Sequence, residues 1–136
     1  MTSTLNDNSS GTVHLPPTAD TIYQHIRDLP IVSPHGHCDP AWFAENSAFR
    51  DPAELLIIPD HYVFRMLYSQ GVPLQDLGIG VDPEARDPRR IFQIFAQHWN
   101  RFLGTPSRQW LEHTFAHVFQ ISEPLTAQTA DHYYDL

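Results

Sequence analysis

The stretch IVSPHGHCDP, residues 31–40, decides how this sequence is interpreted, because it joins an apolar pair to two histidines. Residues 31–33 are bounded by prolines, a pattern typical of a short β-strand. On an extended strand residues i and i+2 point to the same face, so His35 and His37 can present two imidazoles to one cation. Ligands just beyond the end of a strand lie where barrel enzymes keep their chemistry. The sequence therefore predicts part of a metal site, for zinc, manganese or iron, near residues 31–37.

The histidine pair has a second interpretation. With nine histidines in 136 residues, chance alone gives about 0.6 such pairs, so His35 and His37 can also be loop histidines packed near Trp42. Asp39 precedes Pro40 and suits a helix N-cap better than a third ligand position. We expect Cys38 to be a small buried residue rather than a ligand or a nucleophile.

Composition and charge exclude several classes of protein. A chain of 136 residues is about one domain, and its formal charge of −8 disfavours a nucleic-acid or anionic-membrane partner. One cysteine permits no internal disulfide, and no stretch approaches the roughly 20 apolar residues of a membrane span. The polar start of the chain lacks the features of a secretory signal. We expect a cytoplasmic protein with a disordered arm over residues 1–17.

Helix starts are marked by proline preceded by a capping residue. This occurs at Asp39-Pro40, Asp51-Pro52, Asp82-Pro83, Asp87-Pro88 and Thr105-Pro106. Together with apolar periodicity these signals predict helices at residues 18–29, 51–58, 60–70, 87–103, 105–119 and from near 126. The predicted fold is mostly α with one or two short strands. A single strand needs a neighbour for its backbone groups, so either the strand is absent or its partners lie outside this chain.

Three of these helices carry an apolar stripe that we expect to be buried. The stripes are Ile22, Ile26 and Leu29; Ile91, Phe95, Trp99 and Phe102; and Trp110, Leu111, Phe115 and Val118. Gly71 and Gly104 follow helices at positions where a left-handed residue is expected.

A second group of polar side chains lies on the helix DHYVFRMLYSQG, residues 60–71. His61, Arg65 and Tyr68 are spaced i, i+4 and i+7 on one stripe, with Tyr62 alongside. The arginine fork suits a carboxylate, and histidine and tyrosine exchange protons with hydroxyls, so this face fits a small polyhydroxy acid. The alternative is a solvated polar edge with Arg65 paired to an acidic residue.

A pair of histidines on a later helix is interpreted differently. His113 and His117 in HTFAH lack the glutamate of a metalloprotease helix and are interpreted as a polar edge.

Three segments together resemble the N-terminal part of the uronate isomerase family, also called glucuronate isomerases. They are DLPIVSPHGHCDP (28–40), DHYVFRML (60–67) and the closing WLEHTF with FQISEPLTAQTA (110–115 and 119–130), and the resemblance covers residues 15–136. It implies a (β/α)8 TIM-type barrel of the amidohydrolase superfamily with a helical insertion. Residues 18–136 would be the truncated N-terminal part of this metal-dependent enzyme, with the first strand near 31–37 and a helical region over 40–136.

The resemblance also implies an activity and a set of site residues. The family interconverts D-glucuronate with D-fructuronate and D-galacturonate with D-tagaturonate, an aldose–ketose isomerisation. By position, His35 and His37 match its ligands for a divalent metal, zinc or manganese. His61, Tyr62 and Arg65 match its H-Y-x-x-R motif, which contributes to catalysis and to binding of the hexuronate. The family's remaining aspartate ligand and its other contacts have no counterpart here, so we expect this chain alone to be incomplete.

Two other functions remain open at this stage. One is a different metal-dependent hydrolase of the same superfamily, in which the metal activates water. The other is a helical remnant or interaction module without catalysis, whose histidines are structural. The assembly state also stays open, with a homo-oligomer as one expectation.

Overall fold

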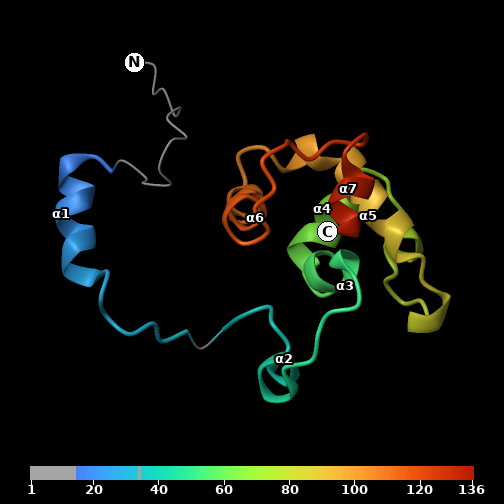
Figure 1. Cartoon of the computed structure of the whole chain (residues 1–136), viewed down its shortest axis with the longest axis horizontal. Coiled ribbons are helices and arrows are strands. Elements are labelled where there is room, and N and C mark those ends of the chain that lie inside the picture. The colour runs from blue at the N-terminus through green and yellow to red at the C-terminus, as the bar shows by residue number, and fades with distance from the viewer. Residues whose placement is uncertain (1–14, 34) are drawn as a thin grey trace. The chain divides into compact units, whose positions relative to one another are not determined.

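Helices joined by loops make up the part of the chain that the computed structural model describes, residues 15–33 and 35–136 (Figure 1). In chain order the elements are α1 (Pro17–Ile26), α2 (Pro40–Glu45), α3 (Pro52–Leu56), α4 (His61–Ser69), the 3-10 helices η1 (Leu74–Leu77) and η2 (Pro83–Ala85), α5 (Pro88–Gln97), the 3-10 helix η3 (Trp99–Phe102), α6 (Pro106–His117) and α7 (Ala130–Asp135). The chain divides into two units, Met1–Gly36 and His37–Leu136.

Aspartate or threonine caps every helix that was expected to start at an Asp-Pro or Thr-Pro pair. The capping oxygens accept from backbone amides, Asp39 from Ala41 (2.9 Å), Asp51 from Glu54 (2.8 Å), Asp82 from Glu84 (3.0 Å), Asp87 from Arg90 (3.0 Å) and Thr105 from Arg108 (3.2 Å). Proline at the first helical position has no N–H that could be left unpaired. The side chain of the capping residue accepts a hydrogen bond from a backbone amide later in the first turn. All five predicted helix starts are confirmed.

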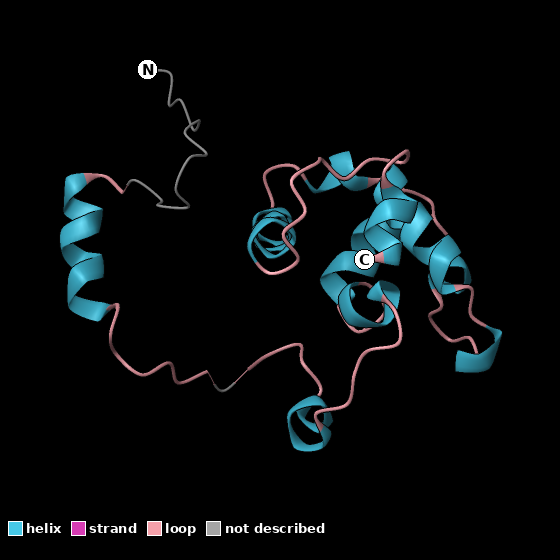
Figure 2. Ribbon diagram, viewed as in Figure 1, coloured by secondary structure: helices cyan, strands magenta, loops and turns pink. Residues whose placement is uncertain are grey.

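Residues 31–33 form no strand, so the predicted strand is wrong (Figure 2). Ile31 and Val32 are 94% and 87% exposed. A strand needs a neighbour to pair its N–H and C=O groups, and the described residues, 15–33 and 35–136, include no strand that could provide one. The mostly helical prediction is confirmed, whereas the one or two short strands are absent from this part of the chain.

The first unit contains α1, which begins one residue before its predicted start and ends three residues before its predicted end. It buries none of its residues, and Ile22 and Ile26 are 59% and 52% exposed, so the expectation that this stripe is buried is wrong. No other helix lies among the described residues of this unit to cover it. Of the predicted disordered arm, residues 1–14 lie outside the described residues, and Pro17 already belongs to α1.

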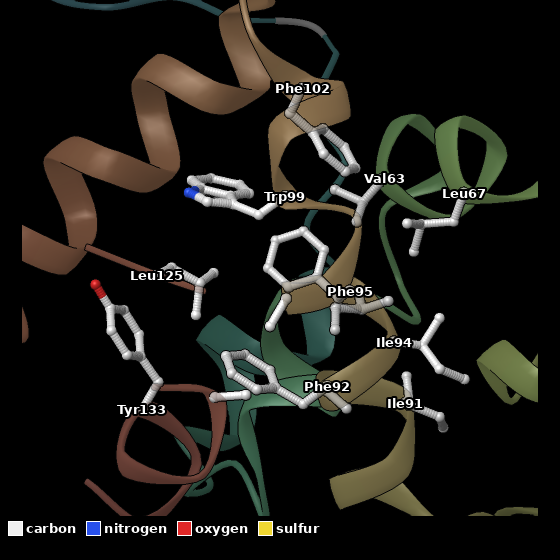
Figure 3. Packing of buried hydrophobic residues seen from close by; sticks show 14 of the residues in the cluster. Val63, Leu67, Ile91, Phe92, Ile94, Phe95, Trp99, Phe102, Leu125 and Tyr133 are labelled. Carbon is white, nitrogen blue, oxygen red and sulfur yellow. The ribbon is translucent and has the colours of Figure 1, made fainter. Parts of the chain in front are cut away.

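The buried core belongs to the second unit and is built around α5, which contacts α3, α7, η1 and η3. The core contains a group of packed aromatic rings (Figure 3). The ring of Phe95 meets those of Trp99 and Phe102 edge to face, with centroids 5.2 Å and 5.5 Å away. Val63 and Leu67 of α4 are buried in the same cluster. Their burial fixes α4 against the core and determines which face of α4 remains accessible.

The expected helix over residues 87–103 is divided in two. α5 ends at Gln97 and η3 continues the chain from Trp99, with the ring of His98 hydrogen-bonded to the Ile94 carbonyl (Nδ1 to O, 2.9 Å). The apolar stripe stays buried because a 3-10 turn still returns Phe102 to the core. Gly104 then adopts φ +76°, the left-handed conformation predicted for it.

The expected burial of the α6 stripe is only partly correct. Phe115 is buried and Leu111 is partly buried against the core, but Trp110 and Val118 are 64% and 66% exposed. Only the Phe115 side of α6 faces the aromatic cluster, where its ring lies 5.9 Å from Trp99. The other side has no apolar surface against it in the described part of the second unit.

The last helix begins at Ala130 rather than near Thr126. The Thr126 hydroxyl instead accepts from the amides of Gln128 and Thr129, both at 3.2 Å, which closes a turn before the helix. α7 then packs on α5 and buries Ala130 and Tyr133.

None of the helices in the described residues is long and apolar enough to cross a membrane. The longest, α6, has 12 residues, against the roughly 20 that a span requires.

Candidate metal and substrate site

The first turn of α4 carries most of the candidate site. Asp60 is its N-cap, with Oδ1 accepting from the Tyr62 amide at 2.8 Å. Val63 and Leu67 anchor the opposite face of the helix in the core. His61 is therefore left half-buried and Tyr62 exposed, so both side chains are accessible from solvent. The helix presents an imidazole and a phenol side by side, with ring centroids 4.6 Å apart.

His37 packs on this turn from the start of the second unit. Its Nδ1 lies 3.1 Å from Asp60 Oδ1, and its ring centroid lies 4.5 Å from His61 and 4.6 Å from Tyr62. The His37 and Asp60 side chains are 20% and 31% exposed, so solvent screens their contact only in part. Residues 23 positions apart thus form one cluster of two imidazoles, a carboxylate and a phenol.

The cluster has the donor set of a divalent metal site. One ligand atom each from His37, Asp60 and His61 can be chosen so that all three lie within 4.8 Å of one another, and each residue is half-buried. Two ligands held at 2.0–2.2 Å from one zinc ion can be at most about 4.4 Å apart. The 4.8 Å bound on the separations lies close to this limit. Imidazole nitrogen and carboxylate oxygen suit zinc or manganese.

Arg65 lies one turn further along α4 and is exposed. Its guanidinium makes no ion pair or hydrogen bond with any residue in the described part of the chain. The alternative interpretation, in which an acidic neighbour neutralises Arg65, is therefore not supported. Tyr68, one turn beyond, is 57% exposed.

His35 belongs to the first unit, where it is exposed and its carbonyl accepts from the Ser33 hydroxyl at 2.6 Å. The structure brings together His37, His61 and Tyr62 among the predicted site residues. The role of His35 beside His37 stays a prediction from the sequence.

Four further residues considered in the sequence analysis lie outside the candidate site. Asp39 is the N-cap of α2, as expected, and not a ligand. Cys38 is exposed, so its expected burial is wrong. On α6, His113 and His117 are exposed and their tilted rings lie 4.4 Å apart between centroids, which agrees with a polar edge.

Sequence reasoning missed Asp60 as a member of the site. The position was assigned only as the start of a helix, because an aspartate before a helical segment is a common N-cap signal. The contact of Asp60 with His37 depends on the tertiary fold, so no local pattern in the sequence indicates it. The available clue was that the presumed cap directly precedes the His61-Tyr62 pair.

Comparison with known proteins identifies the family of the chain that carries the cluster of His37, Asp60, His61 and Tyr62. A protein-family model described as "Glucuronate isomerase" matches residues 11–136. The chain belongs to the glucuronate isomerase family. A uronate isomerase of Mesorhizobium japonicum is 58% identical over 120 residues, which cover 86% of this chain and 26% of that protein. A uronate isomerase of Xanthomonas oryzae pv. oryzae is 54% identical, with 86% and 25% covered.

Solved structures of glucuronate and uronate isomerases agree with this assignment. The crystal structure of glucuronate isomerase from Caulobacter crescentus matches with a TM-score of 0.74 and 51% identity. That of uronate isomerase from Thermotoga maritima matches with a TM-score of 0.68 and 26% identity. Each alignment covers 86% of this chain and 25% of the solved chain. The chain thus spans about a quarter of the length of the glucuronate isomerase relatives that it matches.

Proposed function

We propose that this chain supplies part of the active site of a uronate isomerase. The reaction interconverts D-glucuronate with D-fructuronate and D-galacturonate with D-tagaturonate. The observation that carries the proposal is the packing of His37 against His61 and Tyr62, with ring centroids 4.5 Å and 4.6 Å away, in a chain of this family. Residues 18–136 would form the N-terminal part of a (β/α)8 barrel of the amidohydrolase superfamily, in a cytoplasmic enzyme that can also form a homo-oligomer.

The isomerisation needs two proton transfers. A base removes the C2 proton of the aldose and an acid delivers a proton to C1, while the hydroxyl proton on O2 passes to O1, so that the carbonyl moves from C1 to C2. Tyr62 and His61 are the candidates for these transfers because the phenol and the imidazole both exchange protons and lie side by side. Their position on the first turn of α4 holds both groups on one rigid element.

Substrate binding is assigned to the polar face of α4. Arg65 has no anionic partner in the described part of the chain, and its planar fork of donors matches the carboxylate that distinguishes a uronate from a neutral sugar. His61 and Tyr62 can hydrogen-bond hydroxyls of the same ligand. This face therefore orients the sugar acid by its charged end.

A divalent metal, zinc or manganese, is assigned to His35 and His37. When bound it would supply a Lewis acid for the oxygens of the sugar acid. The half-buried donor cluster around His37 supports this assignment, since a cation there would be only partly screened by solvent.

A chimera tests the function directly. Residues 15–136 of this chain would replace the corresponding segment of the Caulobacter crescentus enzyme, and conversion of D-glucuronate to D-fructuronate would be followed. We expect turnover in the chimera and a loss of at least about 100-fold in its His37→Ala variant. His113→Ala on α6 is the matched control and should keep the activity. A folded chimera that turns over equally well without His37 would contradict the proposal.

The two alternative functions predict other results. A hydrolase would cleave ester or amide substrates without isomerising uronates, and a structural module would give a folded but inactive chimera. Metal analysis of the purified chain adds a separate measurement. Stoichiometric zinc that disappears on changing His35 and His37 would exclude a module with purely structural histidines.

A further inference from the structure

Asp60 makes two contacts with one oxygen atom. Oδ1 accepts from the Tyr62 amide at 2.8 Å, which caps α4, and lies 3.1 Å from Nδ1 of His37. The N-cap of α4 is the only one of the described helix caps that also bonds a histidine ring. The carboxylate thus joins the start of the second unit to the helix that carries His61 and Tyr62.

The short distance to Nδ1 constrains the proton on the His37 ring. A carboxylate oxygen is an acceptor only, so a hydrogen bond between it and a neutral imidazole requires the proton to sit on Nδ1. The other ring nitrogen, Nε2, then carries the lone pair. Histidines that bind metals commonly donate their second N–H to a carboxylate, which fixes both tautomer and ring orientation.

The same geometry disfavours Asp60 as a direct ligand through Oδ1. An oxygen that already accepts from a backbone amide and an imidazole has both in-plane lone pairs engaged. If Oδ1 bound a cation, either its hydrogen bond with the Tyr62 amide or its hydrogen bond with His37 would be broken. If Asp60 instead orients the His37 ring, both hydrogen bonds are kept.

We propose that Asp60 is a positioning residue that holds His37 in its Nδ1–H tautomer, leaving Nε2 to bind the cation, and that it locks this ring to the first turn of α4. The inference rests on the metal role proposed above for His37. It assigns to Asp60 an effect on metal affinity that no other helix cap in the second unit should have.

Three substitutions separate positioning from capping and from direct ligation. Asp60→Asn keeps an oxygen acceptor for both contacts. Asp60→Ser keeps the helix cap, since serine caps as well as aspartate, but its shorter side chain gives up the bond to His37. Asp87→Ser makes the same change at the cap of α5, which bonds only the Arg90 amide. Thermal unfolding of the two serine variants shows whether a cap has been lost.

Two measurements are made on the whole chain. The tautomer of His37 is measured without metal, from ¹⁵N shifts of the ring nitrogens at mildly alkaline pH. Zinc affinity is measured by calorimetry. We expect Nδ1–H in the unaltered chain and in Asp60→Asn, and a tautomer mixture in Asp60→Ser. Zinc affinity should fall about 10- to 100-fold in Asp60→Ser, less than about tenfold in Asp60→Asn, and not at all in Asp87→Ser.

Two results would overturn the proposal. If Asp60→Ser keeps both the tautomer and the affinity of the unaltered chain, Asp60 is only a helix cap. If Asp60→Asn keeps the tautomer but loses zinc binding, the charged carboxylate is itself a ligand. If the unaltered chain binds no zinc, the metal role proposed for His37 fails, whereas the tautomer in Asp60→Ser still decides whether Asp60 orients the ring.

Discussion

Tyr62 is the residue on which the proposed chemistry depends most directly. Its ring lies 4.6 Å from both His37 and His61, and it is 54% exposed on the first turn of α4. In the chimera, Tyr62→Phe removes the phenolic proton and keeps the ring packing. We expect kcat to fall about 100-fold with KM changed only a few-fold, because proton transfer is lost while substrate contacts remain.

Tyr23→Phe is the matched control, since Tyr23 is also a half-exposed helical tyrosine, 49% exposed, and lies on α1 outside the candidate site. It should leave both constants unchanged. If the two variants behave alike, the phenol of Tyr62 takes no part in proton transfer, and His61 becomes the remaining candidate on this turn.

Phe95 is the residue whose loss should affect stability most. It is fully buried, and its ring meets Phe92, Trp99 and Phe102 at centroid distances of 5.8, 5.2 and 5.5 Å. We expect Phe95→Ala to lower the free energy of unfolding by about 3–5 kcal/mol, measured by urea titration of the chain. Phe43→Ala, at a position 78% exposed, should change it by less than about 0.5 kcal/mol. Similar effects at both sites would mean that the aromatic cluster is not the core.

At the scale of elements, the start of α3 makes stability depend on pH. Hydrogen bonds from the Arg50 side chain and amide hold the pKa of Glu54 below its ordinary value, despite an opposing effect of burial. A folded-state pKa below the unfolded one gives stability that is present above the unfolded pKa, about 4.3, and lost as pH falls through the folded pKa.

Glu54→Gln tests this dependence. At pH 7 the variant should be less stable by about 0.5–1 kcal/mol, and the difference should shrink as pH falls below about 4. Urea midpoints measured across this range show the trend. In an Arg50→Gln background, which lacks the Arg50 side-chain bonds to Glu54, the same change should give a much smaller pH-dependent difference. A constant difference for Glu54→Gln at all pH values would exclude the ion pair as its cause.

Local sequence signals predicted where the helices begin better than they predicted which residues are buried or paired. Capping by Asp39, Asp87 and Thr105 was readable because a cap involves only residues a few positions apart. The strand at residues 31–33 was wrong because pairing depends on distant segments, and burial of Trp110 failed for the same reason. In the candidate site, too, local features were predicted and contacts between distant residues were not.

His61 and Tyr62 are neighbours on one helix, so local spacing was enough to predict that their side chains lie close together. The contact of Asp60 with His37 is made by the fold, across 23 positions, and could not be predicted from spacing. Sequence reasoning therefore named residues to which the proposed chemistry is assigned and missed Asp60, which contacts one of them, His37.

At the scale of the whole molecule, apolar residues are distributed unequally between the two units. The buried cluster belongs to His37–Leu136, whereas in the first unit Ile22 and Ile26 of α1 and Leu29 after it are more than half exposed. Burial of apolar surface is the main favourable contribution to folding. Stability of this chain should therefore reside in the second unit.

A chain shortened to residues 37–136 tests this distribution. Because it keeps the aromatic cluster around α5 and the contact of His37 with Asp60, we expect its free energy of unfolding to match that of the 136-residue chain within about 0.5 kcal/mol. Removal of residues 130–136 is the matched control, since it deletes buried Tyr133 from the face of α5 and should cost several kcal/mol. If loss of residues 1–36 were the more costly deletion, the stripe of α1 would have to bury its apolar surface in solution, and the core would extend beyond the second unit.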